Sequence, residues 1–245
     1  TAATTSIADD SVPTGIPVAS TSSANPGEAK IVAEGAHAGH APSQLIAVDT
    51  DVLHLLIDTR GGSLVRADLL AYPSKAATRK DPNPPPTVLL DNDPAHFFVA
   101  QSGLVSSSDT AAQDQPNHLA LFQSEKPSYT LTPGQNELRV ALSWHDASGL
   151  QVTKTYTFKR GSYVIGLSQR IDNGSTKPWQ GNAYRQLQRV APPAASSWLS
   201  HYTDPEQRSF VGGAWYTGEK FEKLTFKDFS DKKDALDSEI TGGWA

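Results

Sequence analysis

Apolar and polar side chains alternate along the middle of the chain, between residues 134 and 161. Residues 138–144 carry an apolar side chain at every second position and end in Trp144. A period of two places the apolar set on one face of an extended strand. A second alternating run begins after the turn-forming residues 146–149. We therefore predict an antiparallel hairpin with one buried face and one solvated face.

Other segments have the same extended character and are separated by glycine- or proline-rich turns. Strands are predicted at residues 46–50, 52–57, 64–70 and 163–171, with loops at residues 59–62, 81–86 and 106–118. Many short strands joined by turns favour an all-β fold built as an antiparallel β-sandwich, and a chain of 245 residues favours a large one.

Residue composition and hydrophobic pattern divide the chain into three parts. Ala, Ser, Thr, Pro and Gly supply 28 of the first 42 residues, which contain no aromatic side chain. Such a segment buries too little apolar area to offset its ordering entropy, so residues 1–42 are predicted to be a flexible tether. Residues 43–226 are predicted to form the β domain. Residues 227–245 are predicted to be a short helical segment.

Composition excludes several classes of function. The net charge is −5 and no basic stripe is present, so we expect no nucleic-acid partner. The chain has no Cys, which excludes disulfides and Cys-ligated zinc. It begins at Thr1 and has no Met. We expect it to be a piece of a longer protein, with the tether following an N-terminal membrane anchor.

The histidines do not form a recognisable catalytic or metal-binding group. His37 and His40 lie three residues apart in the predicted tether, where nothing preorganises a metal site. His54 interrupts an apolar run and is predicted to be a buried, hydrogen-bonded core residue. His145 falls on the outward face of its strand, and His118 falls in a predicted loop. We predict no catalytic residue, no metal site and no cofactor.

Nucleophile and carboxylate motifs are equally uninformative. The chain has no G-x-S-x-G elbow and no phosphate-binding glycine loop. Asp49 and Asp51 flank a predicted strand, and we expect both to be solvated. A glycosidase pair stays open at this point, because its two carboxylates need not be close in the chain.

Aromatic residues in the last third of the domain are the candidates for binding. Two interpretations are open: these side chains line a binding groove, or they cover the apolar core at the open ends of a sandwich. The second is favoured, because a large β core needs bulky aromatic side chains to close its ends. The candidate partner or cleft contacts are Trp179, Trp198, Trp215, Tyr216 and Phe221.

Several short stretches together resemble the large periplasmic domain of Gram-negative YidC-type membrane protein insertases. The resemblance runs from about Leu45 to the C-terminus. The stretches are VDTDVL (48–53), DTRGG (58–62), QSGL (101–104), GQNELRV (134–140), TKTYTFKRG (153–161), EKFEK (219–223) and GGW (242–244).

The resemblance implies a β-supersandwich similar in outline to the galactose mutarotase-like fold, followed by a short helical segment that leads toward the membrane. It implies a non-catalytic domain on the periplasmic side of the bacterial inner membrane, in a multi-pass protein that aids insertion and folding of inner-membrane proteins. The implied partners are nascent membrane proteins, the Sec translocon and its SecDF accessory complex. The domain itself is expected to be a docking or chaperone-like module.

Two other hypotheses stay open. The aromatic residues near loops suggest a β-sandwich that binds extended peptide or carbohydrate in a cleft. A mutarotase-like enzyme is ranked last. It requires a His acid and a carboxylate base that face each other across the cleft, and the sequence shows no convincing pair.

Overall fold

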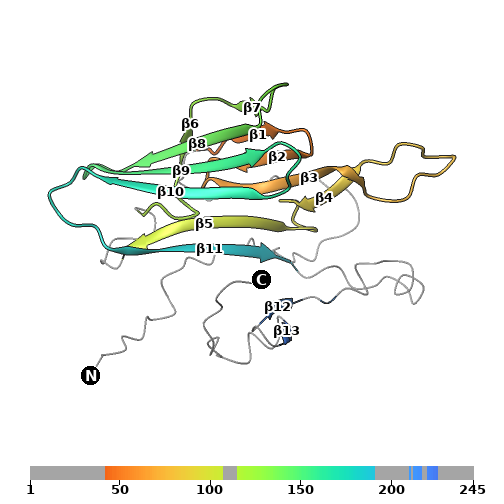
Figure 1. Ribbon diagram of the computed structural model, residues 1–245. Helices are drawn as coiled ribbons and strands as arrows, with labels where there is room; N and C mark the ends of the chain where they lie inside the picture. Colours follow the sequence, from red (N-terminus) through yellow and green to blue (C-terminus); the bar gives the residue numbers. More distant parts are fainter. Residues whose placement is uncertain (1–41, 107–114, 191–209, 211, 217–219, 226–245) are drawn as a thin grey trace, which may run out of the picture. The chain divides into compact units, whose positions relative to one another are not determined.

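The computed structural model describes residues 42–106, 115–190, 210, 212–216 and 220–225 (Figure 1). The chain divides into two compact units, Thr1–Val190 and Ala191–Ala245, and each is described by itself. Of the predicted tether only Pro42 is described, and the predicted helical segment lies outside the described residues. Among the described residues, no helix is long and apolar enough to cross a membrane.

The larger sheet of the first unit has seven strands. They are β1 (Leu45–Asp49), β2 (Leu53–Asp58), β3 (Ser63–Pro73), β4 (Pro86–Leu90), β5 (Phe98–Ser106), β7 (Ser128–Thr130) and β11 (Gly181–Arg189). The order is β11-β5-β3-β2-β1-β7, and β4 pairs with β3 beside this path. All pairs are antiparallel except β1 with β7, so the sheet is mixed where the sequence predicted antiparallel pairing throughout.

The smaller sheet contains the hairpin predicted from the alternating pattern. Its strands are β6 (Gln123–Ser124), β8 (Glu137–His145), β9 (Leu150–Lys159) and β10 (Ile165–Asn173), in the order β10-β9-β8-β6. β8 and β9 pair from Glu137↔Lys159 to His145↔Gln151. Gly149 in the connecting turn has a φ of 95°, a conformation that glycine adopts without steric cost. The predicted hairpin is confirmed.

The two sheets enclose one apolar core, and Figure 1 shows the smaller sheet lying over the larger one. Inward side chains come from alternate positions of both sheets, as a period of two requires. The larger sheet contributes Val48 and Leu55, and the smaller sheet contributes Val140, Val152 and Phe158, all of them fully buried. The first unit is therefore a β-sandwich, and the predicted all-β class is confirmed.

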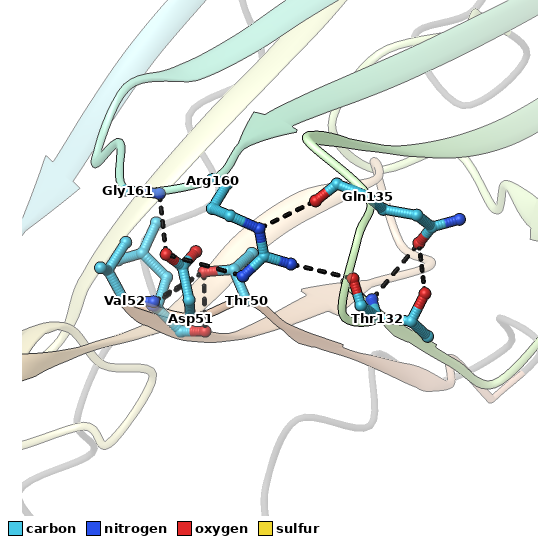
Figure 2. Close-up of polar contacts among 8 residues, drawn as sticks. Thr50, Asp51, Val52, Thr132, Gln135, Arg160 and Gly161 are labelled. Atoms are coloured by element: carbon cyan, nitrogen blue, oxygen red, sulfur yellow. Dashed lines mark hydrogen bonds and ion pairs between the residues drawn. The ribbon is translucent and has the colours of Figure 1, made fainter.

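Polar contacts join three loops at one end of the sandwich (Figure 2). Arg160 donates from Nε to the carbonyl oxygen of Gln135 at 2.9 Å and from Nη2 to that of Thr132 at 2.9 Å. Asp51 accepts a hydrogen bond from the amide of Gly161 at 2.9 Å and lies 4.0 Å from the Arg160 guanidinium. The turn between β1 and β2 is thereby tied to the turn after β9.

One expectation about a single residue needs correction. His54 is only half-buried, because it alternates with the buried Leu53 and Leu55 and so lies on the outer face of β2, and its Nδ1 lies 2.6 Å from a carboxylate oxygen of Asp49. Asp49 and Asp51 keep solvent exposure, as predicted, and each also contacts a protein group. His145 and Trp144 lie as predicted, exposed and buried respectively.

The second unit contains one described hairpin. β12 (Gly212–Tyr216) pairs antiparallel with β13 (Phe221–Thr225), with Tyr216 opposite Phe221.

Candidate functional site

One face of β11 continues the inner face of the larger sheet but is open to solvent. Leu64 of β3 pairs with Ala100 of β5, and Ala100 pairs in turn with Leu187 of β11. Directly paired residues share a face, and both Leu64 and Ala100 pack against the core. Leu187 is nevertheless 66% exposed. The larger sheet therefore extends past the smaller one at β11, where no described strand covers its inner face.

A cleft of about 510 Å³ opens at this edge. Its apolar lining consists of Leu64, Ala100, Tyr156, Ile165, Leu167 and Leu187, and its polar lining consists of Gln101, Ser102, Arg185 and Gln186. The lining comes from both sheets, with Ile165 and Leu167 on β10 and Arg185 to Leu187 on β11. An apolar cleft with a few polar groups is the usual form of a ligand site.

Two strand edges border the cleft. Among the described strands, β10 pairs only with β9, and β11 pairs only with β5. Each strand is therefore terminal in its sheet and presents backbone donors and acceptors on its outer edge. Such an edge can accept the backbone of an extended polypeptide, while nearby apolar pockets select its side chains.

A buried lysine fixes the floor of the cleft. Lys154 of β9 is fully buried between the sheets. Its ammonium donates to the carbonyl oxygens of Gly61 at 2.5 Å and Ser102 at 2.6 Å, and to the hydroxyl of Ser102 at 3.1 Å. It also lies 4.7 Å from the ring centroid of Phe122. Burial lowers the pKa of Lys154 from 10.5 to about 7, because the interior disfavours the charged form.

Tyr156 forms a further hydrogen bond between the two sheets, beside this lysine. Its hydroxyl donates to the carbonyl oxygen of Gly62 at 2.5 Å, and burial raises its pKa. Tyr156 and Ser102 both line the cleft. The floor is thus held by hydrogen bonds that span the two sheets, and this leaves little freedom for its shape to change.

A histidine and a tyrosine lie behind the larger sheet. The Tyr184 hydroxyl accepts from the His118 amide at 2.9 Å and lies 2.6 Å from its Nδ1. His118 is buried, and its Nε2 has no hydrogen-bond partner among the described residues. Burial chiefly, with a smaller effect of the Lys154 charge, lowers the pKa of His118 to about 4. The imidazole is therefore neutral at pH 7, and the polar loop predicted at 106–118 ends in buried residues.

The cleft is lined by apolar and uncharged polar groups together with one arginine. Its described lining contains one guanidinium, two amides and two hydroxyls, and no imidazole or carboxylate. The acid–base pair that a mutarotase-like reaction requires is not found there. The described part of the chain also contains no group of three or more His, Asp or Glu placed to hold a metal ion. These side chains can contact a ligand through apolar surface and hydrogen bonds.

Comparison with known proteins identifies the family. A family model described as the YidC periplasmic domain matches residues 45–245. The chain belongs to the YidC periplasmic domain family. This membership places the domain in the periplasm.

Relatives named "Membrane protein insertase YidC" share this region. The protein of Methylococcus capsulatus is 44% identical over 203 residues, and that of Thioalkalivibrio sulfidiphilus is 40% identical over 202 residues. The matches cover 82% and 81% of this chain but 34% of each relative. The protein of Aeromonas hydrophila is 37% identical over 222 residues, which is 89% of this chain and 38% of that relative. The chain thus spans about a third of the length of these relatives.

Stretches that resemble the YidC periplasmic family meet at the cleft floor. Residues 58–62 contain the two glycines whose carbonyl oxygens accept from Lys154 and Tyr156. Residues 101–104 contain Ser102, and residues 153–161 contain both donors. The family likeness therefore coincides with the polar contacts that hold the two sheets together.

Of the aromatic candidates, Trp179 is the one that the structure describes in the first unit, and it is not among the residues that line this YidC-family cleft. Trp179 is partly buried against the core, in agreement with a role as a lid. Tyr216 and Phe221 belong to the second unit, with ring centroids 5.0 Å apart and Phe221 71% exposed. Trp215 lies in β12, and Trp198 lies outside the described residues. Their role in contacts stays a prediction.

No sequence pattern singled out Leu187, Arg185 or Lys154 as cleft residues. Lys154 could have been found from the alternation of β9, since it has the same parity as the buried Val152 and Tyr156. The exposed inner face of β11 had no local signal, because it depends on which strand covers it.

Proposed function

We propose that this domain is a non-catalytic docking module of a membrane protein insertase, and that the cleft between β10 and β11 holds extended apolar segments of nascent membrane proteins. The parent protein would insert and fold inner-membrane proteins alone or with the Sec translocon and its SecDF complex. The observation that carries the proposal is the open apolar cleft bordered by two terminal strands.

The cleft suits an extended polypeptide in two respects. Leu187 and Leu167 offer apolar contacts from opposite sheets, and burial of one leucine-sized side chain is worth about 1.5–3 kcal/mol. The outer edge of β10 or β11 can add backbone hydrogen bonds that do not depend on sequence. A docking module for many different client proteins requires this kind of tolerant recognition.

Site-specific photo-crosslinking in the full-length insertase tests the proposal. A photoreactive residue is placed at Leu187, in membranes that carry ribosome-bound chains of an inner-membrane protein. The matched control is Leu45, an exposed leucine on a strand of the same sheet that does not line the cleft. We expect crosslinks to the nascent chain from position 187 and not from position 45. Equal crosslinking from both positions, or none from position 187, contradicts docking in the cleft.

A third position in the same experiment addresses the Sec partners. Phe221 is the exposed aromatic residue of the β12–β13 hairpin, within the segment that the sequence predicted to contact partners. Crosslinks from position 221 to a SecDF or translocon subunit would support that prediction. Capture of Sec subunits from position 45 alone would reject it.

A further inference from the structure

The hairpin of β3 and β4 carries a surface that the proposed function does not use. β3 runs for 11 residues, and its last four residues are exposed. The loop of residues 74–85 follows, and β4 returns from Pro86. Figure 1 shows the hairpin and its loop extending beyond the ends of the neighbouring strands. We call residues 70–89 the β3–β4 tip.

Large apolar side chains are exposed on both strands of the tip. They are Leu70 and Tyr72 on β3, and Val88 and Leu89 on β4, each between 40% and 54% exposed. Val88 pairs with Asp68 and Thr87 with Leu69, and Leu70 and Tyr72 follow on β3 where the register shifts before Pro73, so these apolar side chains lie on neighbouring stretches of one hairpin. The ring of Tyr72 lies 5.5 Å from that of Tyr163, which precedes the exposed Val164. Apolar groups that cluster in this way are typical of an interaction surface.

The loop adds positive charge to this apolar surface. Residues 74–85 contain Lys75, Arg79 and Lys80 but only one acidic residue, Asp81. Lys75 pairs with Asp81 at 2.7 Å. Arg79 and Lys80 are exposed, and neither forms an ion pair with another described residue. The tip is thus locally basic on a chain whose net charge is −5.

We propose that the β3–β4 tip contacts an anionic phospholipid surface. Leu70, Tyr72 and Leu89 would enter the interfacial region, where a tyrosine ring keeps its hydroxyl among the headgroups. Arg79 and Lys80 would lie against lipid phosphates. Charge complementarity favours an anionic membrane over other binding partners of the tip. An anionic surface attracts the basic tip and repels most of the rest of the negatively charged chain. The family relatives are membrane protein insertases, so a membrane lies close to the domain.

The expected binding is weak and reversible. Each basic residue near an anionic surface strengthens partitioning by roughly fivefold, so Arg79 and Lys80 together give about 25-fold. A contact of this strength does not anchor a protein, but it can orient a domain that is already held near the bilayer.

Vesicle flotation with the 245-residue chain tests the proposal. Vesicles of phosphatidylethanolamine with phosphatidylglycerol are compared with vesicles of phosphatidylcholine alone, at low salt. We expect binding to the anionic vesicles only, and a loss of at least about 25-fold in the variant Arg79→Glu/Lys80→Glu. The matched control, Lys126→Glu/Lys159→Glu, changes the net charge equally at exposed positions elsewhere and should retain most of the binding.

A second variant separates the apolar contribution from charge. Tyr72→Ser/Leu89→Ser should weaken binding to anionic vesicles without changing the net charge, and circular dichroism should show an unchanged fold because both side chains are exposed. Equal binding to neutral vesicles, no binding at all, or equal losses in tip and control variants would overturn the proposal. A dimer in vesicle-free sedimentation that the tip variants abolish would assign the surface to a second copy instead, and would also overturn it.

Discussion

The lysine beneath the cleft makes the stability of the sandwich depend on pH. Burial lowers the pKa of Lys154 to about 7, while in the unfolded chain the pKa stays near 10.5. Between these values the unfolded chain binds more protons than the native protein. The unfolding free energy is therefore highest above the unfolded pKa, where the lysine is neutral in both states. It decreases as the pH falls toward the folded pKa, because the unfolded chain takes up a proton that the native protein does not. The unfolding free energy should therefore decrease from about pH 10.5 to about pH 7.

The size of the effect follows from the two pKa values. Lys154 is fully buried, so solvent does not screen the cost of charging it. Between about pH 9.5 and about pH 7 the linkage amounts to roughly two pKa units, or about 3 kcal/mol. Lys154→Met removes the ionisable group and should abolish this change. It also leaves the carbonyl oxygens of Gly61 and Ser102 without this donor, at about 1–3 kcal/mol each.

Urea denaturation at about pH 7, 8 and 9.5 measures the effect, with tryptophan fluorescence as the signal because Trp144 lies in the core. The variant should be the less stable protein at about pH 9.5, and its deficit should shrink by about 3 kcal/mol at about pH 7. Lys159→Met, an exposed lysine at the end of the same strand, should keep the pH dependence of the parent. A Lys154→Met variant that loses as much stability as the parent between these pH values would refute the reasoning.

Two further predictions concern the residues around this lysine. Gly61→Ala should destabilise the domain by at least about 2 kcal/mol more than Gly134→Ala, as measured by urea denaturation. Both glycines have positive φ, but a Cβ at Gly61 would collide with the backbone of His118, whereas the space at Gly134 is open; similar losses would contradict this steric argument. The parent should lose about 3 kcal/mol of unfolding free energy through His118 as the pH falls from about 6.5 to about 4, because the pKa of the buried imidazole is lowered to about 4. The variant His118→Gln should not show this loss. Parallel acid-denaturation curves for parent and variant would reject it.

Local periodicity predicted six of the eleven strands of the first unit, β1, β2, β3, β8, β9 and β10. β8 and β9 were expected from alternation over residues 134–161 and are found at Glu137–His145 and Leu150–Lys159. β10 was expected at residues 163–171 and is found at Ile165–Asn173. These predictions succeed because a strand with one buried face has apolar residues at every second position, and this pattern can be seen in the sequence. Five strands were missed. The short strands β6 and β7 have two or three residues, which carry no measurable period. The longer strands β4, β5 and β11 were not predicted either.

Single polar residues were harder to place. His54 was predicted to be buried and is half-exposed, while His118 was placed in a polar loop and is buried. In both cases the neighbouring residues in the sequence gave the wrong prediction of burial. Burial depends on which side chains from elsewhere in the chain pack against the residue. Tyr184 is the partner of His118, and it lies 66 residues away.

The sequence by itself determined which side chains share a face of each strand, because parity along an extended chain is a local property. It also carried enough short motifs to indicate the YidC periplasmic family. Only the tertiary structure decided that Lys154 reaches Gly61 and Ser102, which are 93 and 52 residues away. It also decided that β11 is the last described strand of the larger sheet and leaves Leu187 exposed. Strand order and sheet overlap arise from packing between distant segments, so the cleft has no local signature in the chain.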